Sequence, residues 1–156
     1  MNVRIASRED ADIVGKVHSD AWKSAYRGIF SDEYIDSDTN IKRRNEFLES
    51  IQDDTCTYFL LEESDQAAGI VKTHKSNSAL EIESIYILSE HRGKGLGRLF
   101  IDFIKANRSE SIFLWVLEVN TNARRFYEKN GFVRTGETRT ITRGGEFKQL
   151  RYELRR

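Results

Sequence analysis

Proline is absent from this sequence of 156 residues, and cysteine occurs only once, at Cys56. Without proline there is no Pro-rich linker, so the length favours a single domain over 1–156. One cysteine excludes an internal disulfide and a cysteine-based zinc cluster. Because Cys56 lies in the apolar run C-T-Y-F-L-L, we interpret it as a small buried hydrophobic residue rather than a nucleophile.

The sequence also lacks an excess of charge of either sign, with 25 Lys and Arg against 25 Asp and Glu. Nucleic-acid and anionic-membrane binders draw on a basic excess, so neither partner is expected. The longest apolar run, Ile112–Leu117, is too short to cross a membrane. The start M-N-V-R-I is not typical of a signal peptide, and no two histidines have metal-ligand spacing. We expect a reduced, cytoplasmic location and no metal.

Hydrophobic periodicity predicts a mixed sheet covered by helices. One helix is expected between Ser7 and Gly28, a shorter one over 41–51, one starting at Leu96 and one ending at Gly131. The fold class is therefore α/β (α+β), with about seven strands and four helices on both faces of the sheet. The expected strands are 3–6, 55–63, 66–74, 80–88, 112–117, 132–141 and 147–154.

The third long strand carries an irregularity in its alternation. Leu80 and Ile82 are apolar, but the next apolar pair is Ile85 and Ile87, one residue out of step. A slip of one residue in a period of two is the trace that a β-bulge leaves in a sequence. Bulges redirect backbone groups, so a functional site is expected beside Glu83, the residue at the slip.

A short basic turn with three alternating glycines follows this strand and leads directly into an amphipathic helix. The first N–H groups of a helix have no partner within the helix, and the helix dipole adds positive potential there. Glycine allows close approach of the backbone, and three basic side chains add charge. The segment R-G-K-G-L-G-R over 92–98 therefore predicts a bound di- or polyphosphate.

Two common phosphate-binding patterns do not fit the turn. No G-x-x-x-x-G-K-[ST] loop is present, and the spacing of the glycines fails the dinucleotide fingerprint. A nucleotide-binding enzyme that uses the turn for ATP remains an alternative, although the missing lysine and serine count against it.

The turn and its preceding strand resemble the acetyl-CoA motif R/Q-x-x-G-x-G/A of the GNAT superfamily of N-acetyltransferases. Arg92, Gly95 and Gly97 match that motif. The segment Leu114–Phe132, L-W-V-L-E-V-N-T-N-A-R-R-F-Y-E-K-N-G-F, resembles the following strand and helix of the same family. The resemblance covers nearly the whole chain and implies acetyl-CoA as cosubstrate.

The resemblance also implies how acetyl-CoA is held. Two central strands should splay apart, with the pantetheine arm pairing beside Ile85 and Ile87 and the Ile87 N–H facing the thioester carbonyl. The turn should hold the pyrophosphate, and Asn120 should hydrogen-bond the cofactor. The implied cofactor-binding residues are Ile85, Ile87, Arg92, Gly93, Lys94, Gly95, Leu96, Gly97, Arg98, Asn120 and Ala123.

The same resemblance implies an acid and leaves the base open. Tyr127 matches the family's usual general acid, which protonates the departing thiolate; the alternative is that Tyr127 and Phe126 are core aromatics. Glu83 is the first candidate for the base, with Glu81 second, because a strand places both on one face. The alternative is that both carboxylates only face solvent.

The acceptor is an amine-bearing small molecule or peptide that the sequence does not identify. The segment A-W-K-S-A-Y-R-G-I-F-S-D-E-Y-I-D resembles a substrate-lining helix–loop–helix, with Trp22, Tyr26, Phe30 and Tyr34 as candidate walls. Its acids, Asp32, Glu33, Asp36 and Asp38, could attract a cationic amine or could simply cap a helix. A homodimer and a non-catalytic acyl-CoA-binding domain also remain open.

Overall fold

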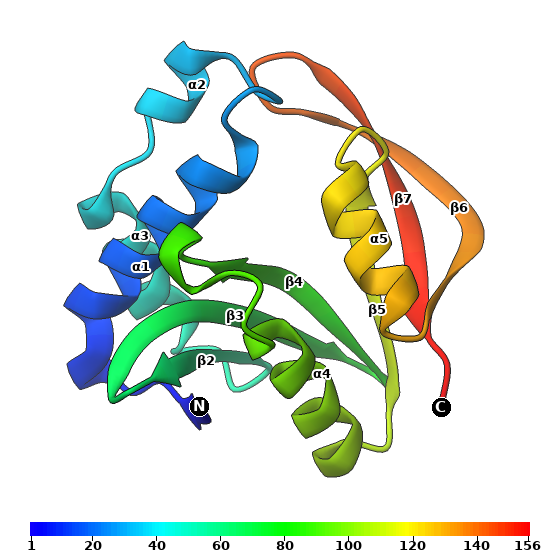
Figure 1. Cartoon of the computed structure of the whole chain (residues 1–156), viewed down its shortest axis with the longest axis horizontal. Helices are drawn as coiled ribbons and strands as arrows, with labels where there is room; N and C mark the ends of the chain where they lie inside the picture. The colour runs from blue at the N-terminus through cyan, green and yellow to red at the C-terminus, as the bar shows by residue number, and fades with distance from the viewer.

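The computed structural model describes every residue from Met1 to Arg156 and contains one sheet of seven strands in the order β1-β2-β3-β4-β5-β7-β6 (Figure 1). Only β4 and β5 run parallel, and all other neighbours are antiparallel. The strands are β1 (Asn2–Ile5), β2 (Cys56–Glu63), β3 (Gln66–Ser76), β4 (Ala79–Ile87), β5 (Ser111–Leu117), β6 (Phe132–Thr142) and β7 (Glu146–Leu154). The predicted fold class is confirmed.

The helices comprise the four that the sequence predicts and one that it does not. They are α1 (Ala11–Tyr26), α2 (Asp32–Asp36), α3 (Asn40–Ser50), α4 (Leu96–Asn107) and α5 (Thr121–Lys129), with short 3-10 turns η1 (Arg8–Asp10) and η2 (Ser89–His91). The additional helix α2 is too short to show periodicity and buries only Ile35. The Ser31 side chain caps it by accepting a hydrogen bond from the Tyr34 N–H. None of the helices is long and apolar enough to cross a membrane.

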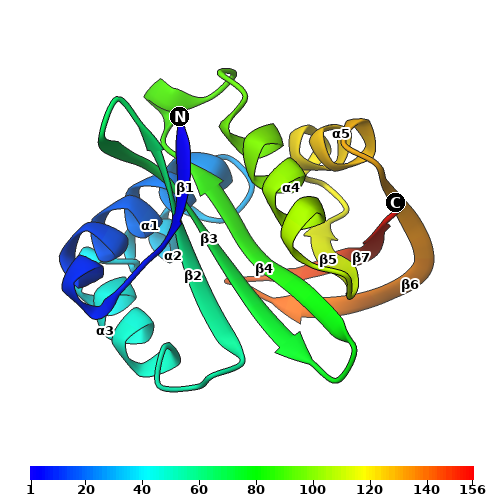
Figure 2. The same cartoon turned by 90° about the horizontal axis from the view of Figure 1, so that it is seen from below.

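The two faces of the sheet are covered by different helices (Figure 2). Alternate residues of β2 illustrate the division, because Tyr58 and Leu60 pack in one apolar cluster and Phe59 and Leu61 in another. The first cluster includes Val14 of α1 and further residues of α1 and α3, and the second includes residues of α4 and α5. The sheet is therefore a middle layer with apolar packing on both sides.

The predicted β-bulge is confirmed and lies at the predicted residue. Lys72 of β3 pairs with Ser84 of β4, but the next residue, Thr73, pairs with Ile82, which leaves Glu83 without an opposite partner. An extra residue of this kind bends the bulged strand and increases its twist.

Strands β4 and β5 pair over only three positions, from Ala79 opposite Ser111 to Glu81 opposite Phe113. Beyond Glu81, β4 has no strand partner on this side, while β5 is paired with β7 along its other edge. Figure 1 shows the two strands diverging from this point, which confirms the expected splaying. An unpaired edge in the middle of the sheet is the feature around which the site is built.

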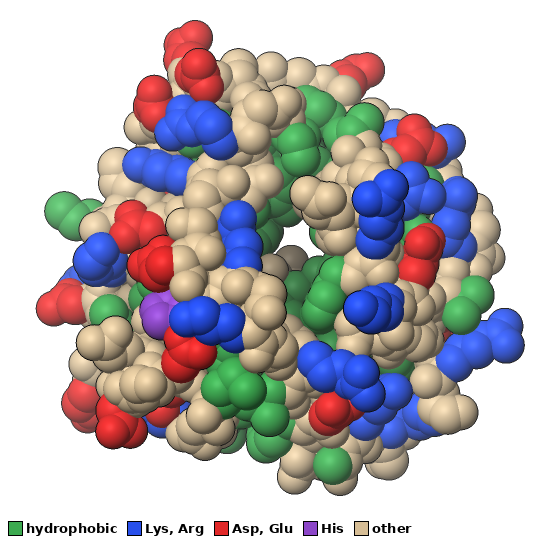
Figure 3. All heavy atoms as spheres, in the orientation of Figure 1, with side chains coloured by type: hydrophobic (Ala, Val, Ile, Leu, Met, Phe, Trp, Pro, Cys, Tyr) green, Lys and Arg blue, Asp and Glu red, His purple; other side chains and the backbone are tan.

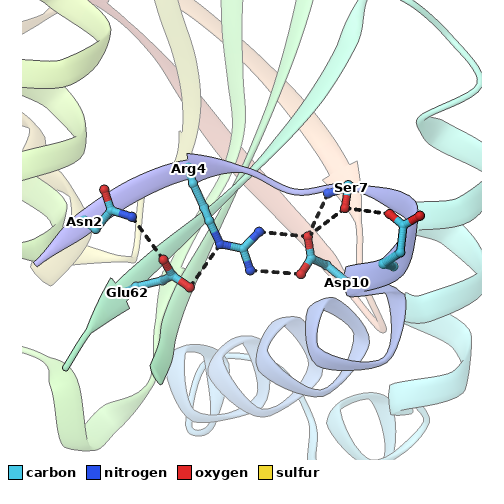
Figure 4. Close-up of polar contacts among 6 residues, drawn as sticks. Asn2, Arg4, Ser7, Asp10 and Glu62 are labelled. Atoms are coloured by element: carbon cyan, nitrogen blue, oxygen red, sulfur yellow. Dashed lines mark hydrogen bonds and ion pairs between the residues drawn. The ribbon is translucent and has the colours of Figure 1, made fainter. Parts of the chain in front are cut away.

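A polar network fixes the N-terminal strand to the rest of the fold (Figure 4). Arg4 of β1 donates two hydrogen bonds of 2.9 Å to Asp10 and one of 3.0 Å to Glu62 of β2. Asp10 also accepts a hydrogen bond of 2.8 Å from the Ser7 N–H at the start of η1. The Arg4 guanidinium is the main reason that the pKa of Asp10 is lowered to about 2.

We predict that Asp10→Asn lowers the free energy of unfolding at neutral pH by about 1 to 2 kcal/mol, discounted because Arg4 is 40% exposed. The lowered pKa means that the ionised carboxylate stabilises the fold above the ordinary aspartate pKa. This contribution is lost as pH falls through the lowered pKa, so the difference between variant and wild type should narrow between about pH 4 and pH 2. Urea denaturation across this range measures it.

Asp12→Asn is the matched control, because the Asp12 side chain is 92% exposed and makes only a surface ion pair with Arg44. Its expected cost is less than about 1 kcal/mol. Equal losses in the two variants, or a difference for Asp10→Asn that does not shrink as pH falls from about 4 to about 2, would contradict the role given to the Arg4–Asp10 pair.

Candidate functional site

A cleft of about 1090 Å³ fills the space between the diverging strands. Figure 3 shows it as a hollow near the middle of the molecule, with apolar side chains inside it and Lys and Arg side chains on its rim. One end is bounded by the glycine turn, α4 and α5, and the other by α1, α2, α3 and the β6–β7 hairpin. The site therefore has two halves, which meet at β4.

The glycine turn offers a row of free backbone donors at the first half of the cleft. The N–H groups of residues 93–98 find no acceptor in the protein, because the first hydrogen bond of α4 runs from the Leu99 N–H to the Gly95 carbonyl. Gly93 and Gly95 have φ of +74° and +91°, and a Cβ at either would meet no atom within 4 Å. A row of such donors at a helix start fits a pyrophosphate.

The basic side chains of this turn already have partners. Arg92 donates to the Ile87 carbonyl at 3.0 Å and to the Ser24 hydroxyl of α1 at 2.6 Å, and Arg98 pairs with Asp102 at 3.4 Å. Lys94 pairs with Glu63 of β2 at 3.0 Å and does not line the cleft. The backbone, more than the side chains, therefore makes this end of the cleft suitable for an anion.

Gly97 serves the packing of two helices. A Cβ at this position would lie 2.7 Å from the ring of Phe126 on α5, so only glycine allows α4 and α5 this close. Phe126 is partly buried against the apolar cluster of this face and also borders the cleft. The third glycine of the motif brings α5, and with it Tyr127, to the wall of the cleft.

Helix α5 brings Asn120, Ala123 and Tyr127 to the cleft. The Asn120 side-chain oxygen caps the helix by accepting a hydrogen bond of 3.3 Å from the Ala123 N–H. Tyr127 is only 9% exposed, and its hydroxyl makes no hydrogen bond within the protein. Burial, and secondarily the nearby Tyr86, raises the pKa of Tyr127 well above its usual value, so the phenol is neutral.

The two carboxylates of β4 lie in different surroundings, although both line the cleft. Glu83, at the bulge, forms an ion pair of 3.2 Å with Lys72 of β3. Glu81 is half-buried and has no ion-pair partner. Burial, followed by the charge of Glu83, raises the pKa of Glu81 above its usual value. The Glu81 carboxylate is thus free of a cation partner and lies in surroundings that favour uptake of a proton.

The second half of the cleft has an aromatic wall. Tyr26 stacks on Phe30 with ring centroids 4.7 Å apart, and Trp22 lies within 5.9 Å of both. These rings line the cleft and also form a small apolar cluster with Ile35 and Leu117. The pocket-wall interpretation and the core interpretation of the sequence therefore both hold for Trp22, Tyr26 and Phe30.

The acidic residues after α1 do not form the amine-attracting surface that the sequence suggested. Asp32 and Asp36 pair with Arg27 on the outside of the molecule, both at 3.2 Å. Only Asp38 reaches the cleft, and it is bound to Arg43 at 2.8 Å. Asp32 and Glu33 lie in the first turn of α2, but the cap itself is Ser31, so these acids neither cap the helix nor face the cleft.

Several residues of the cleft could not be predicted from the sequence. Tyr86 of β4 shares a hydrogen bond of 3.2 Å with Tyr26 between their hydroxyls. His18 is 1% exposed, and neither ring nitrogen has a partner. Burial first, and then the charges of Arg43 and Lys72, lowers the pKa of His18 to about 3, so the imidazole is neutral. Arg139 and Arg143 reach the cleft from the β6–β7 hairpin.

Comparison with known proteins agrees with this geometry. The chain is 27% identical over 131 residues to an uncharacterized N-acetyltransferase of Bacillus subtilis, covering 77% of this chain and 73% of that protein. It is 29% identical over 142 residues to a spermidine N(1)-acetyltransferase of Thermoplasma acidophilum, covering 85% and 88%.

Among solved structures, the PaiA N-acetyltransferase of Thermoplasma acidophilum in complex with coenzyme A superposes with a TM-score of 0.74. The match covers 100% of both chains at 24% sequence identity, which demonstrates a shared fold. The model of the acetyltransferase (GNAT) family matches residues 18–132, from the middle of α1 to the start of β6. This chain therefore belongs to the GNAT family of acetyltransferases.

Proposed function

We propose that this acetyltransferase passes an acetyl group from acetyl-CoA directly to a primary amine held in the second half of the cleft. The observation that carries the proposal is the continuous path from the unpaired edge of β4 to the free N–H groups of residues 93–98. The coenzyme A bound to a protein of the same fold supports the same ligand here.

The chain's own groups fit this cosubstrate along its length. The N–H groups of residues 93–98 bind the pyrophosphate, and the β4 edge beside Ile85 and Ile87 pairs with the amide-bearing arm as an added strand. Asn120 and Ala123 border the arm from α5. The Ile87 N–H acts as the donor for the carbonyl oxygen, where negative charge develops.

The transfer forms a carbon–nitrogen bond and breaks the carbon–sulfur bond of the thioester that acetyl-CoA supplies. Glu81 takes the proton that the amine loses, directly or through one water. We assign this role to Glu81 in place of Glu83 because Lys72 already neutralises Glu83, whereas Glu81 has no partner and a raised pKa.

Tyr127 gives its proton to the departing sulfur, which would otherwise leave as a thiolate. Its hydroxyl is free of other hydrogen bonds, and its raised pKa keeps the proton in place until sulfur develops charge. The acceptor is an amine; the spermidine acetyltransferase among the relatives is one precedent for this class.

We predict that Gly95→Ala weakens acetyl-CoA binding by about tenfold or more, because a φ of +91° costs an alanine about 1 to 2 kcal/mol and relaxation displaces the free N–H groups. Gly28→Ala is the control, since Gly28 has φ of +89° but lies outside the cleft. Calorimetry should give weakened binding for Gly95→Ala alone. A greater rise in melting temperature with ATP than with acetyl-CoA would favour a nucleotide-binding function instead.

We predict that Tyr127→Phe lowers kcat by about a hundredfold or more and leaves the Kd for acetyl-CoA unchanged, because only the proton donor is removed. The measurements are thiol release and calorimetry. Tyr58→Phe is the matched control: its hydroxyl is buried without a hydrogen-bond partner and lies outside the cleft. Full activity in Tyr127→Phe would contradict the assignment of Tyr127 as the acid.

We predict that Glu81→Gln abolishes the acid limb of the pH profile of kcat/KM, whereas Glu83→Gln keeps that limb but moves it to lower pH. The shift follows because the charge of Glu83 raises the pKa of Glu81. Thiol release between pH 5 and pH 9 tests both variants. Loss of the limb in Glu83→Gln, with retention in Glu81→Gln, would return the role to Glu83.

A further inference from the structure

The charged side chains in the second half of the cleft do not suit a polycation. Four acids line this half, and three of them form ion pairs with two neighbouring cations, Arg43 being shared by two carboxylates. Arg43 pairs with Asp38 at 2.8 Å and with Glu46 at 3.4 Å, while Lys72 pairs with Glu83 at 3.2 Å. Glu81 is the only one of the four without an ion pair, and a single free carboxylate can pair with only one amine of a polycation.

The same half of the cleft holds cations that nothing neutralises. Lys42, Arg139 and Arg143 line it, and none of them has a carboxylate within 4.0 Å. His18 is neutral and adds no charge. Free cations therefore outnumber free anions where the acceptor binds, and this surplus favours an acceptor with negative charge.

Arg139 is held in a fixed position that leaves donors free. Its guanidinium lies 4.3 Å from the centroid of the Trp115 ring, and its Nε donates to the Gln149 side chain at 2.6 Å. The two terminal nitrogens make no hydrogen bond with the protein. Glu81, Arg139 and Arg143 all line the cleft.

Arg143 approaches the same space from the turn between β6 and β7. The following residue, Gly144, packs against Tyr34 of α2, which holds the turn over the aromatic wall. Arg143 lines the cleft together with the hydrogen-bonded phenols of Tyr26 and Tyr86. One Nη of Arg143 donates to the Thr142 carbonyl, and its other donors are free.

We propose that the acceptor is a small amine that also carries a carboxylate or phosphate group, which Arg139 and Arg143 bind while Glu81 receives the proton from the amine. A guanidinium presents paired donors that match both anions. The proposal rests on the proposed acetyl transfer and specifies its acceptor. Spermidine, a polycation without an anionic group, is expected to be a poor acceptor.

Matched amine pairs that differ only in the anion provide the test. The pairs are β-alanine with β-alaninamide, and phosphoethanolamine with ethanolamine, with spermidine as the polycation. The measurements are kcat/KM from thiol release and, with coenzyme A present, Kd from calorimetry. We expect the anionic member of at least one pair to exceed its neutral partner by about tenfold or more. The pair with the larger difference between its anionic and neutral members shows whether the site prefers a carboxylate or a phosphate.

The variant Arg143→Gln should reduce the value for the anionic member to that of its neutral partner. Arg134→Gln is the matched control, because Arg134 is an exposed arginine of β6 without an ion pair and outside the cleft. Arg134→Gln should preserve the preference for the anionic member over its neutral partner. A loss of preference confined to Arg143→Gln identifies an anion subsite, which a general effect of net charge would not produce.

The proposal is overturned if no anionic member binds or reacts better than its neutral partner, if spermidine exceeds all of them, or if Arg143→Gln keeps the preference. These outcomes differ from failure of acetyl transfer itself, which would appear as absent acetyl-CoA binding or absent thiol release with every amine.

Discussion

The site depends on one departure from regular sheet geometry, the extra residue Glu83 in β4. The strand pairs with β5 as far as Glu81 and then leaves it, so backbone groups in the middle of a sheet are left without a strand partner. Unpaired backbone groups in a protein interior are costly unless water or a ligand satisfies them. The divergence is tolerated because the unpaired part of β4, residues 84–87, lines the cleft, where water or a ligand can satisfy its backbone groups.

Much of this arrangement could be predicted from local patterns. The slip in alternation between Ile82 and Ile85 located the bulge, because the period of a strand is short and any interruption is visible within a few residues. The glycine turn could also be predicted, because its pattern lies within a few consecutive residues. Helix α2 was missed because five residues cannot display helical periodicity, and its stability comes from a cap and an arginine outside it.

The charged groups were the least predictable part, because their partners lie far away in sequence. Glu81 and Glu83 are indistinguishable by alternation, and only Lys72, on a neighbouring strand, separates them. Lys94 was predicted as a phosphate ligand, and its ion pair with Glu63 of β2 could not be foreseen from the sequence. Arg139 gave no signal, because β6 is exposed along nearly its whole length and its orientation depends on Trp115 and Gln149.

Strand β6 also has an open side, since it is the last strand of the sheet. Its register with β7 is interrupted between Arg134 and Thr138, where Gly136 has φ of +93°. A kink of this kind hinders another chain from extending the sheet over the full length of the strand. The irregular edge therefore disfavours edge-to-edge association, while Arg139 and Ile141 of the same strand still line the cleft.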